Sequence, residues 1–87
     1  MNLDDFRTTR HELNRPLLVI SGSRGALTCG YVSLDALNKL GDAAAIVRGV
    51  ADFDDMLTAE VQDVSEAATA LGVTVGMTGE QALELFR

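Results

Sequence analysis

The fold class is decided by residues 16–32, PLLVISGSRGALTCGYV. Residues 17–20 form a short, continuous apolar run, which is typical of a strand covered on both faces. The following five residues, Ser21–Gly25, are a cluster of small and polar residues that favours a turn. A second extended run then begins at Ala26 and reaches Val32. Two apolar runs joined by a short glycine-containing turn predict a β-hairpin.

The second run of this hairpin has two unequal faces. Because side chains alternate along a strand, Leu27, Cys29 and Tyr31 share one face. The other face carries only Ala26, Thr28, Gly30 and Val32. This small-residue face suits close packing by a helix or by another subunit.

After the hairpin, the sequence pattern predicts a short helix and then a strand. Ser33 is a good N-cap for a helix over 34–40, and Gly41 suits the left-handed residue that ends it. Residues 42–50 could be helical by alanine propensity. Glycines bracket the segment and Ile46 and Val47 are β-branched, so we predict a strand.

Further on, the spacing predicts one long helix over 52–71, with Asp52 as its N-cap and Gly72 as its stop; Thr58 offers an alternative break. Residues 73–75 form either a brief strand or a return loop. A last helix begins at Thr78, where Gln81 completes a capping box.

Before the hairpin, residues 1–12 are polar and lack clear periodicity. They are either poorly ordered or an edge strand, which the β-propensity of Thr8 and Thr9 favours weakly. The whole sequence, 1–87, is expected to form a single α+β domain. It has a small mixed or antiparallel sheet of about four strands, with three to four helices mainly on one face.

A chain this short has little material left for the opposite face of its sheet. Ordering costs on the order of 1.5 kcal/mol per residue against a modest buried area. We therefore expect a homo-oligomer, and a two-fold dimer is the commonest form.

The charge excludes some classes of protein. Seven basic and thirteen acidic residues give a net charge of −6, which argues against nucleic-acid binding because that needs a basic surface. The excess is concentrated in residues 51–87, which hold eight acidic residues and one basic residue. No apolar run is long enough to span a membrane, and the acidic start, residues 1–5, is unlike a signal peptide. We expect a cytoplasmic protein with neither cofactor nor metal.

Several segments resemble one family in the same order. They are LTCGY (residues 27–31), NKLGD (38–42), AIVRGV (45–50), FDDML (53–57) and GMTGEQAL (76–83). Together these are similar to the YunC-like family, also called domain of unknown function 1805. The resemblance covers the chain from about residue 13 onward, and residues 1–12 do not follow the family pattern. It implies a small α+β protein of uncharacterised activity, and it carries over no catalytic residue.

Cys29 is the candidate catalytic residue. A nucleophilic role requires a lowered thiol pKa and a nearby base, and His11 is the one histidine available. The alternative is a buried small apolar side chain, since free cysteine is among the most buried residue types.

Arg48, Gly49 and Asp52 are the candidate ligand-binding residues. Arg48 lies at the end of a predicted strand, glycine permits close approach, and a helix start follows. Arginine can bind a carboxylate or phosphate through two hydrogen bonds. The alternative is an ion pair between Arg48 and an aspartate, within the chain or across a subunit interface.

Two further patterns are weak. Gly22–Gly25 matches the four-residue pattern of a KH-type loop, and Ser21–Gly25 after a strand faintly resembles a phosphate-binding loop. The segment joins two strands, so a hairpin turn with Arg24 exposed at its tip is predicted. Glu60, Asp63 and Glu66 could approach a metal ion, but their spacing also suits a solvated helix face.

The sequence thus predicts a homo-oligomeric module that binds a small anion or a partner protein near Arg48. The alternative is a small enzyme that uses Cys29 near a subunit interface on an unknown metabolite. A purely structural subunit of a larger assembly is a third reading.

Overall fold

Five strands form one mixed sheet in the order β1-β2-β3-β4-β5. The computed structural model describes all residues from 1 to 87. The strands are β1 (Arg7–Glu12), β2 (Pro16–Ser21), β3 (Ala26–Thr28), β4 (Ala44–Ile46) and β5 (Asp63–Val64). Neighbouring strands are antiparallel except β3 and β4, which are parallel. The class is α+β, as predicted, with one strand more than expected.

Four short helices complete the chain: α1 (Leu34–Leu40), α2 (Phe53–Thr58), α3 (Glu66–Ala70) and α4 (Gly79–Phe86). Their N-caps are Ser33, Asp52, Ser65 and Thr78, whose side chains each accept a hydrogen bond from a backbone N–H in the first turn. The predicted capping box of Thr78 and Gln81 is present. Gly41 ends α1 in the left-handed conformation, with φ at +75°, which favours glycine.

The predicted hairpin of β2 and β3 is confirmed, with Ile20 opposite Leu27. Its second strand is shorter than the predicted run 26–32, because pairing ends after Thr28. Gly30 and Tyr31 lie in a turn instead. Glycine lacks a side chain to pack in a strand interior and often ends the regular ladder.

The edge strand at the N-terminus is also confirmed. β1 pairs along its full length with β2, from Arg7 opposite Ser21 to Glu12 opposite Pro16. All six of its side chains are exposed, so pairing with β2 rather than burial holds it. An ion pair between Arg10 and Glu12 lies along the strand, and charges of this kind discourage pairing with another sheet edge.

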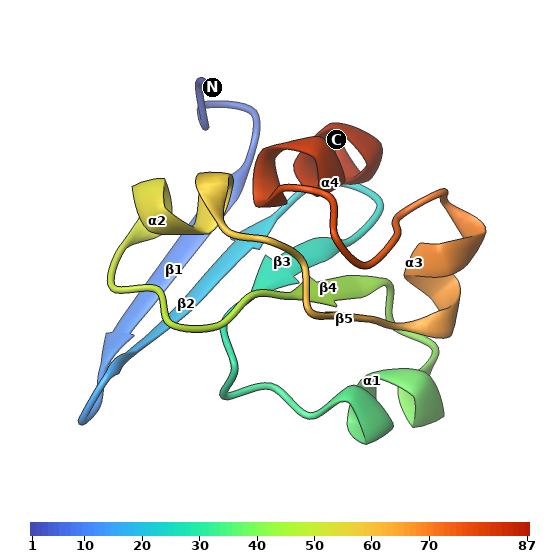
Figure 1. Cartoon of the computed structure of the whole chain (residues 1–87), viewed down its shortest axis with the longest axis horizontal. Helices are drawn as coiled ribbons and strands as arrows, with labels where there is room; N and C mark the ends of the chain where they lie inside the picture. Colours follow the sequence, from blue (N-terminus) through green and yellow to red (C-terminus); the bar gives the residue numbers. More distant parts are fainter.

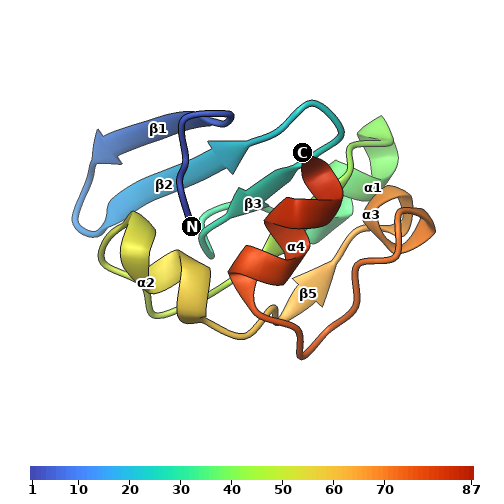
Figure 2. The ribbon, with the colours of Figure 1, turned by 90° about the horizontal axis from the view of Figure 1, so that it is seen from above.

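The sheet has one well-covered face and one partly covered face. α4 packs against β3 and α2 on the first face, as Figures 1 and 2 show. The core there includes Leu18, Ile20, Leu27, Leu83 and Phe86, each with no exposed surface. α1 lies on the opposite side, below β4 in Figure 1. No residue of α1 is buried, so this helix is only loosely covered by its own chain.

The prediction of a single helix over residues 52–71 is wrong. α2 ends at Thr58, the residue at which the sequence offered an alternative break, and the chain then runs extended through β5. Val61 exchanges backbone hydrogen bonds with the loop before α4, donating to Met77 and accepting from Gly76. Ser65 then starts α3, and its hydroxyl also accepts the N–H of Ala44 at 2.9 Å. Sheet pairing therefore outweighs the helical spacing of the apolar residues. Residues 73–75 form a return loop.

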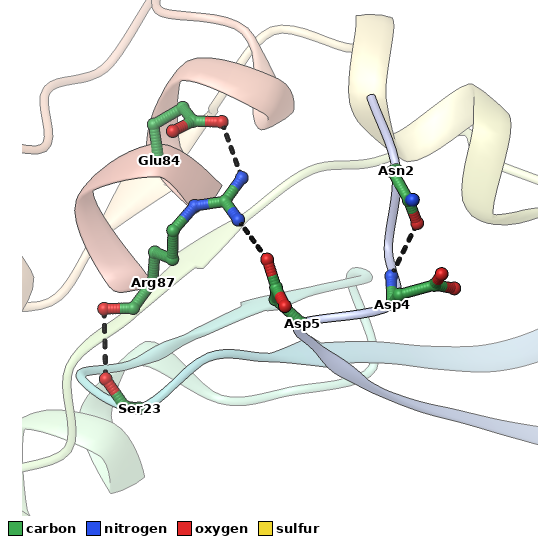
Figure 3. Close-up of polar contacts among 6 residues, drawn as sticks. All are labelled: Asn2, Asp4, Asp5, Ser23, Glu84 and Arg87. Carbon is green, nitrogen blue, oxygen red and sulfur yellow. Dashed lines mark hydrogen bonds and ion pairs between the residues drawn. The ribbon is translucent and has the colours of Figure 1, made fainter.

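The C-terminus is fastened to the N-terminal segment and to the β2–β3 turn (Figure 3). Nη1 of Arg87 lies 2.6 Å from Asp5, and its Nη2 lies 2.9 Å from Glu84. The hydrogen bond to Glu84 raises the pKa of Arg87 above its ordinary value. The guanidinium also lies over the ring of Phe6, 5.1 Å from its centroid. Ser23 donates a 2.9 Å hydrogen bond to the backbone carbonyl of Arg87.

Candidate functional site

Three strand ends meet at one end of the sheet and enclose a cleft of about 330 Å³. β2 begins there, and β3 and β4 end there, because β2 runs antiparallel to β3 and β3 parallel to β4. The lining residues are Arg15, Pro16, Gly30, Tyr31, Arg48, Gly49 and Val50. The volume is within the range of pockets that bind small molecules. The crevice beyond the carboxyl ends of parallel strands is a common ligand position in α/β sheets.

Arg48 is held in the cleft by two contacts. Its Nη2 lies 2.7 Å from Oδ2 of Asp63 in β5. Its aliphatic stem crosses Gly30, where an added Cβ would be 3.2 Å from Cγ of Arg48. The side chain is still 51% exposed, so the remaining N–H groups of the guanidinium can reach a ligand. The ion pair considered from the sequence is therefore present within the chain, and Asp63 is its carboxylate.

Arg15 places a second cation on the cleft, and it forms no ion pair with any acidic side chain. Its backbone N–H donates a 3.2 Å hydrogen bond to the hydroxyl of Tyr31. This contact ties the β1–β2 turn to the segment after β3. No acidic residue lines the cleft, so its local charge is opposite in sign to the net charge of the chain.

Backbone N–H groups add to this positive character. Those of Gly30, Tyr31, Gly49 and Val50 have no hydrogen-bond acceptor within the chain. Gly49 has φ at +73°, a left-handed conformation that favours glycine. Backbone donors without partners beside two arginines are the chemistry that binds carboxylate and phosphate oxygens.

Of the three predicted ligand-binding residues, the structure brings together two. Arg48 and Gly49 line the cleft, whereas Asp52 is the N-cap of α2, where its Oδ1 accepts the N–H of Asp55 at 2.8 Å. Sequence reasoning missed Arg15, Gly30 and Tyr31. The glycine within the apolar run was the available signal, because it marks where strand pairing ends.

Cys29 lies outside the cleft lining and is 4% exposed. Its sulfur accepts a hydrogen bond from the backbone N–H of Leu18 at 3.3 Å. His11 is exposed on the edge strand β1, opposite Leu17, and forms no hydrogen bond or ion pair with Cys29. The structure thus gives the thiol a packing environment and no adjacent base.

The other two patterns are also placed by the structure. Gly22 donates a 2.8 Å hydrogen bond to the carbonyl of Gly25, and Arg24 is exposed, as the hairpin turn predicts. Asp63 pairs with Arg48, while Glu60 and Glu66 lie on separate extended and helical segments. No group of three or more histidine, cysteine or acidic side chains is close enough to hold a metal ion. None of the helices is both long and apolar enough to cross a membrane.

Comparison with known proteins identifies the family. The model of DUF1805, a domain of unknown function, matches residues 28–86, which is more than half of the chain. The chain belongs to the DUF1805 family. It is 33% identical over 70 residues to the uncharacterised protein YunC of Bacillus subtilis, an alignment covering 76% of this chain and 69% of YunC. A solved structure of a protein of unknown function from Thermoplasma acidophilum, TA1206, is similar with a TM-score of 0.82 and 32% identity. The similarity spans 94% of this chain and 93% of that one.

The DUF1805 match begins at Thr28, at the end of β3. It therefore includes Gly30, Tyr31, Arg48 and Gly49 of the cleft, and leaves Arg15 outside. The match confirms the resemblance expected from the sequence.

Proposed function

We propose that this DUF1805 domain is a binding module whose cleft between Arg15 and Arg48 takes the oxyanion group of a small molecule, a phosphate or a carboxylate. The observation that carries this proposal is that one cleft is lined by two arginines and by four residues whose backbone N–H groups have no acceptor within the chain, and by no acidic residue. Arginine can present paired donors to either anion. The chain as a whole is negatively charged, whereas the charged residues that line this cleft are both positive.

Binding fits the cleft better than catalysis does. Among its seven lining residues there is no histidine, cysteine, serine, threonine, lysine or carboxylate, which are the side chains that most often act as nucleophile or general base. The hydroxyl of Tyr31 is engaged by the N–H of Arg15. These groups can hold and orient an oxyanion.

The test is calorimetric titration with inorganic phosphate and with acetate at low ionic strength. Saturable binding by the wild-type domain is expected, and replacing Arg15 or Arg48 by glutamine should weaken it at least fivefold. Arg7→Gln is a matched control, because Arg7 is also exposed but lies in β1, outside the cleft. Equal losses for all three variants would reveal a general charge effect and contradict the proposal. The two probes distinguish a phosphate site from a carboxylate site.

The same domain is proposed to act as a homodimer. Strand register places Thr9 and Val19 on the face opposite the main core, and no helix lies over β1 and β2 on that side (Figure 1). The centre of this face is uncharged, which suits a two-fold interface because residues near the axis meet their own copies. Leu13 and Tyr31, each 48% exposed, lie at the cleft end of these strands. The second copy would extend from this face to the cleft rim.

Sedimentation analysis at low micromolar concentration tests the dimer. The wild-type domain should sediment as a dimer, and Leu13→Lys should shift it toward monomer. Val75→Lys is the control, since Val75 is 64% exposed in the loop between α3 and α4. A wild-type monomer, or the same shift in both variants, would contradict this interface.

A further inference from the structure

A second groove of about 330 Å³ lies between α1 and the β2–β3 hairpin. It shares no lining residue with the Arg15–Arg48 cleft. Its floor is formed by the small side chains of β3 and β4, including Ala26, Thr28 and Ala44, and Leu37 of α1 lines it as well. These strand residues share one face of the sheet, since Ala26 lies opposite Ala44 and Thr28 opposite Ile46. Because these side chains are small, they leave space for a ligand between α1 and the sheet.

Two opposite charges line this groove without neutralising each other. Arg24 comes from the hairpin turn and Asp42 from the segment between α1 and β4. Neither forms an ion pair within 4.0 Å, with the other or with any other residue. A single anion or a single cation would leave one of these charges unmatched. A ligand that carries both a carboxylate and an ammonium group matches both.

Two hydroxyl groups on the floor lack good partners within the chain. Thr28 is 4% exposed, and its hydroxyl donates only a long 3.5 Å hydrogen bond to the carbonyl of Ala45. The hydroxyl of Ser21, which also lines the groove, forms no hydrogen bond within the chain. A buried polar side chain such as Thr28 normally has a well-formed partner, and Ser21 is partly exposed. Both hydroxyls can therefore accept from or donate to a bound polar group.

We infer that this groove binds a small α-amino acid as its zwitterion, with the carboxylate on Arg24, the ammonium group on Asp42 and further hydrogen bonds to Ser21 and Thr28. The side chain of the ligand would face Leu37. This site is independent of the cleft proposed above, because a different set of residues forms it. It gives the domain two binding sites of different charge preference, one for anions and one for zwitterions.

The test is a titration of the isotope-labelled full chain with L-valine, followed by amide chemical shifts. Saturable shifts are expected at residues 26, 28 and 44 and not at residues 30 and 49. N-acetyl-L-valine keeps only the negative charge and L-valinamide only the positive one. Each should bind at least tenfold more weakly than L-valine.

Variants assign the two charges. Arg24→Gln and Asp42→Asn should each weaken binding of L-valine at least tenfold. Both residues are exposed, so neither substitution is expected to disturb the fold, and circular dichroism checks this. Lys39→Gln and Asp35→Asn change exposed charges on α1 outside the groove and should leave binding unchanged. The inference is overturned if L-valine gives no saturable shifts, if the blocked analogues bind equally well, or if the shifts appear at the Arg15–Arg48 cleft instead.

Discussion

The guanidinium of Arg48 and the carboxylate of Asp63 lie 2.7 Å apart and join the end of β4 to β5. Both side chains are partly exposed, at 51% and 35%, and exposed pairs of this kind contribute about 0.2–1 kcal/mol to stability. The pair therefore matters less for holding the sheet together than for fixing the direction of Arg48. It also places a negative charge next to the Arg15–Arg48 cleft.

Removing that negative charge should strengthen anion binding. Asp63→Asn raises the net charge near the cleft by one unit, while Gly30 still supports the stem of Arg48. Two unit charges 4 Å apart in water interact with about 1 kcal/mol, so we expect phosphate to bind roughly fivefold more tightly, with the gain lost at high salt. Calorimetry at two ionic strengths measures this. Weaker phosphate binding by Asp63→Asn would contradict this prediction. It would mean that Asp63 helps binding more by orienting Arg48 than it hinders binding through its own negative charge.

The absence of a side chain at residue 30 should be required for the cleft. An added Cβ meets Cγ of Arg48 at 3.2 Å, so Gly30→Ala displaces Arg48 slightly and Gly30→Leu occupies the space of a ligand. Phosphate affinity should fall modestly for alanine and at least tenfold for leucine. The thermal midpoint should change little for alanine, because Gly30 has no positive φ. Unchanged affinity in Gly30→Leu would place the anion elsewhere.

The thiol of Cys29 should be unreactive in the folded protein. Its sulfur is buried and accepts the N–H of Leu18, and a thiol reagent reaches such a group only when the chain opens. Reaction of Cys29 with a disulfide reagent that releases a coloured thiolate should therefore be slow at neutral pH. It should become complete in denaturant. Fast modification of the native protein would instead support the enzyme reading based on Cys29.

The N-caps of α4 and α1 should contribute unequally to stability. Thr78→Ala removes the cap of α4, whose residues Ala82, Leu83 and Phe86 are fully buried in the core. We expect it to lower the free energy of unfolding by about 0.5–2 kcal/mol. Ser33→Ala removes the equivalent bond from α1, which buries no residue, so its effect should be smaller. Urea unfolding compares the two, and an equal or larger loss for Ser33→Ala would show that α1 is better anchored than its burial indicates.

Local sequence signals predicted those elements whose ends are chemically marked. The turn at 21–25, the caps Ser33 and Thr78, and the stop at Gly41 are each set by neighbouring residues. The helix predicted over 52–71 failed because its apolar spacing suited a helix while long-range pairing decided the outcome. Val61 bonds to the loop at 76–77, fifteen or more residues away. Such pairing leaves no local trace in a single sequence.

Only part of the candidate site could be predicted from the sequence, because long-range strand pairing also decides which residues meet there. Arg48 and Gly49 follow one strand directly, so their place at a sheet end could be inferred from the pattern. Arg15 lies more than thirty residues earlier, and it reaches the cleft because β2 runs antiparallel to β3. Strand order therefore had to be known before the two arginines could be paired.

Amide chemical shifts during titration with inorganic phosphate test the central claim most directly. Gly30, Tyr31, Gly49 and Val50 line the cleft, and their backbone N–H groups have no partner in the chain. Their resonances should move together along one saturation curve, and the movement should be lost in the Arg15→Gln, Arg48→Gln double variant. Shifts scattered over exposed basic residues, or none at these four amides, would contradict an anion site at this end of the sheet.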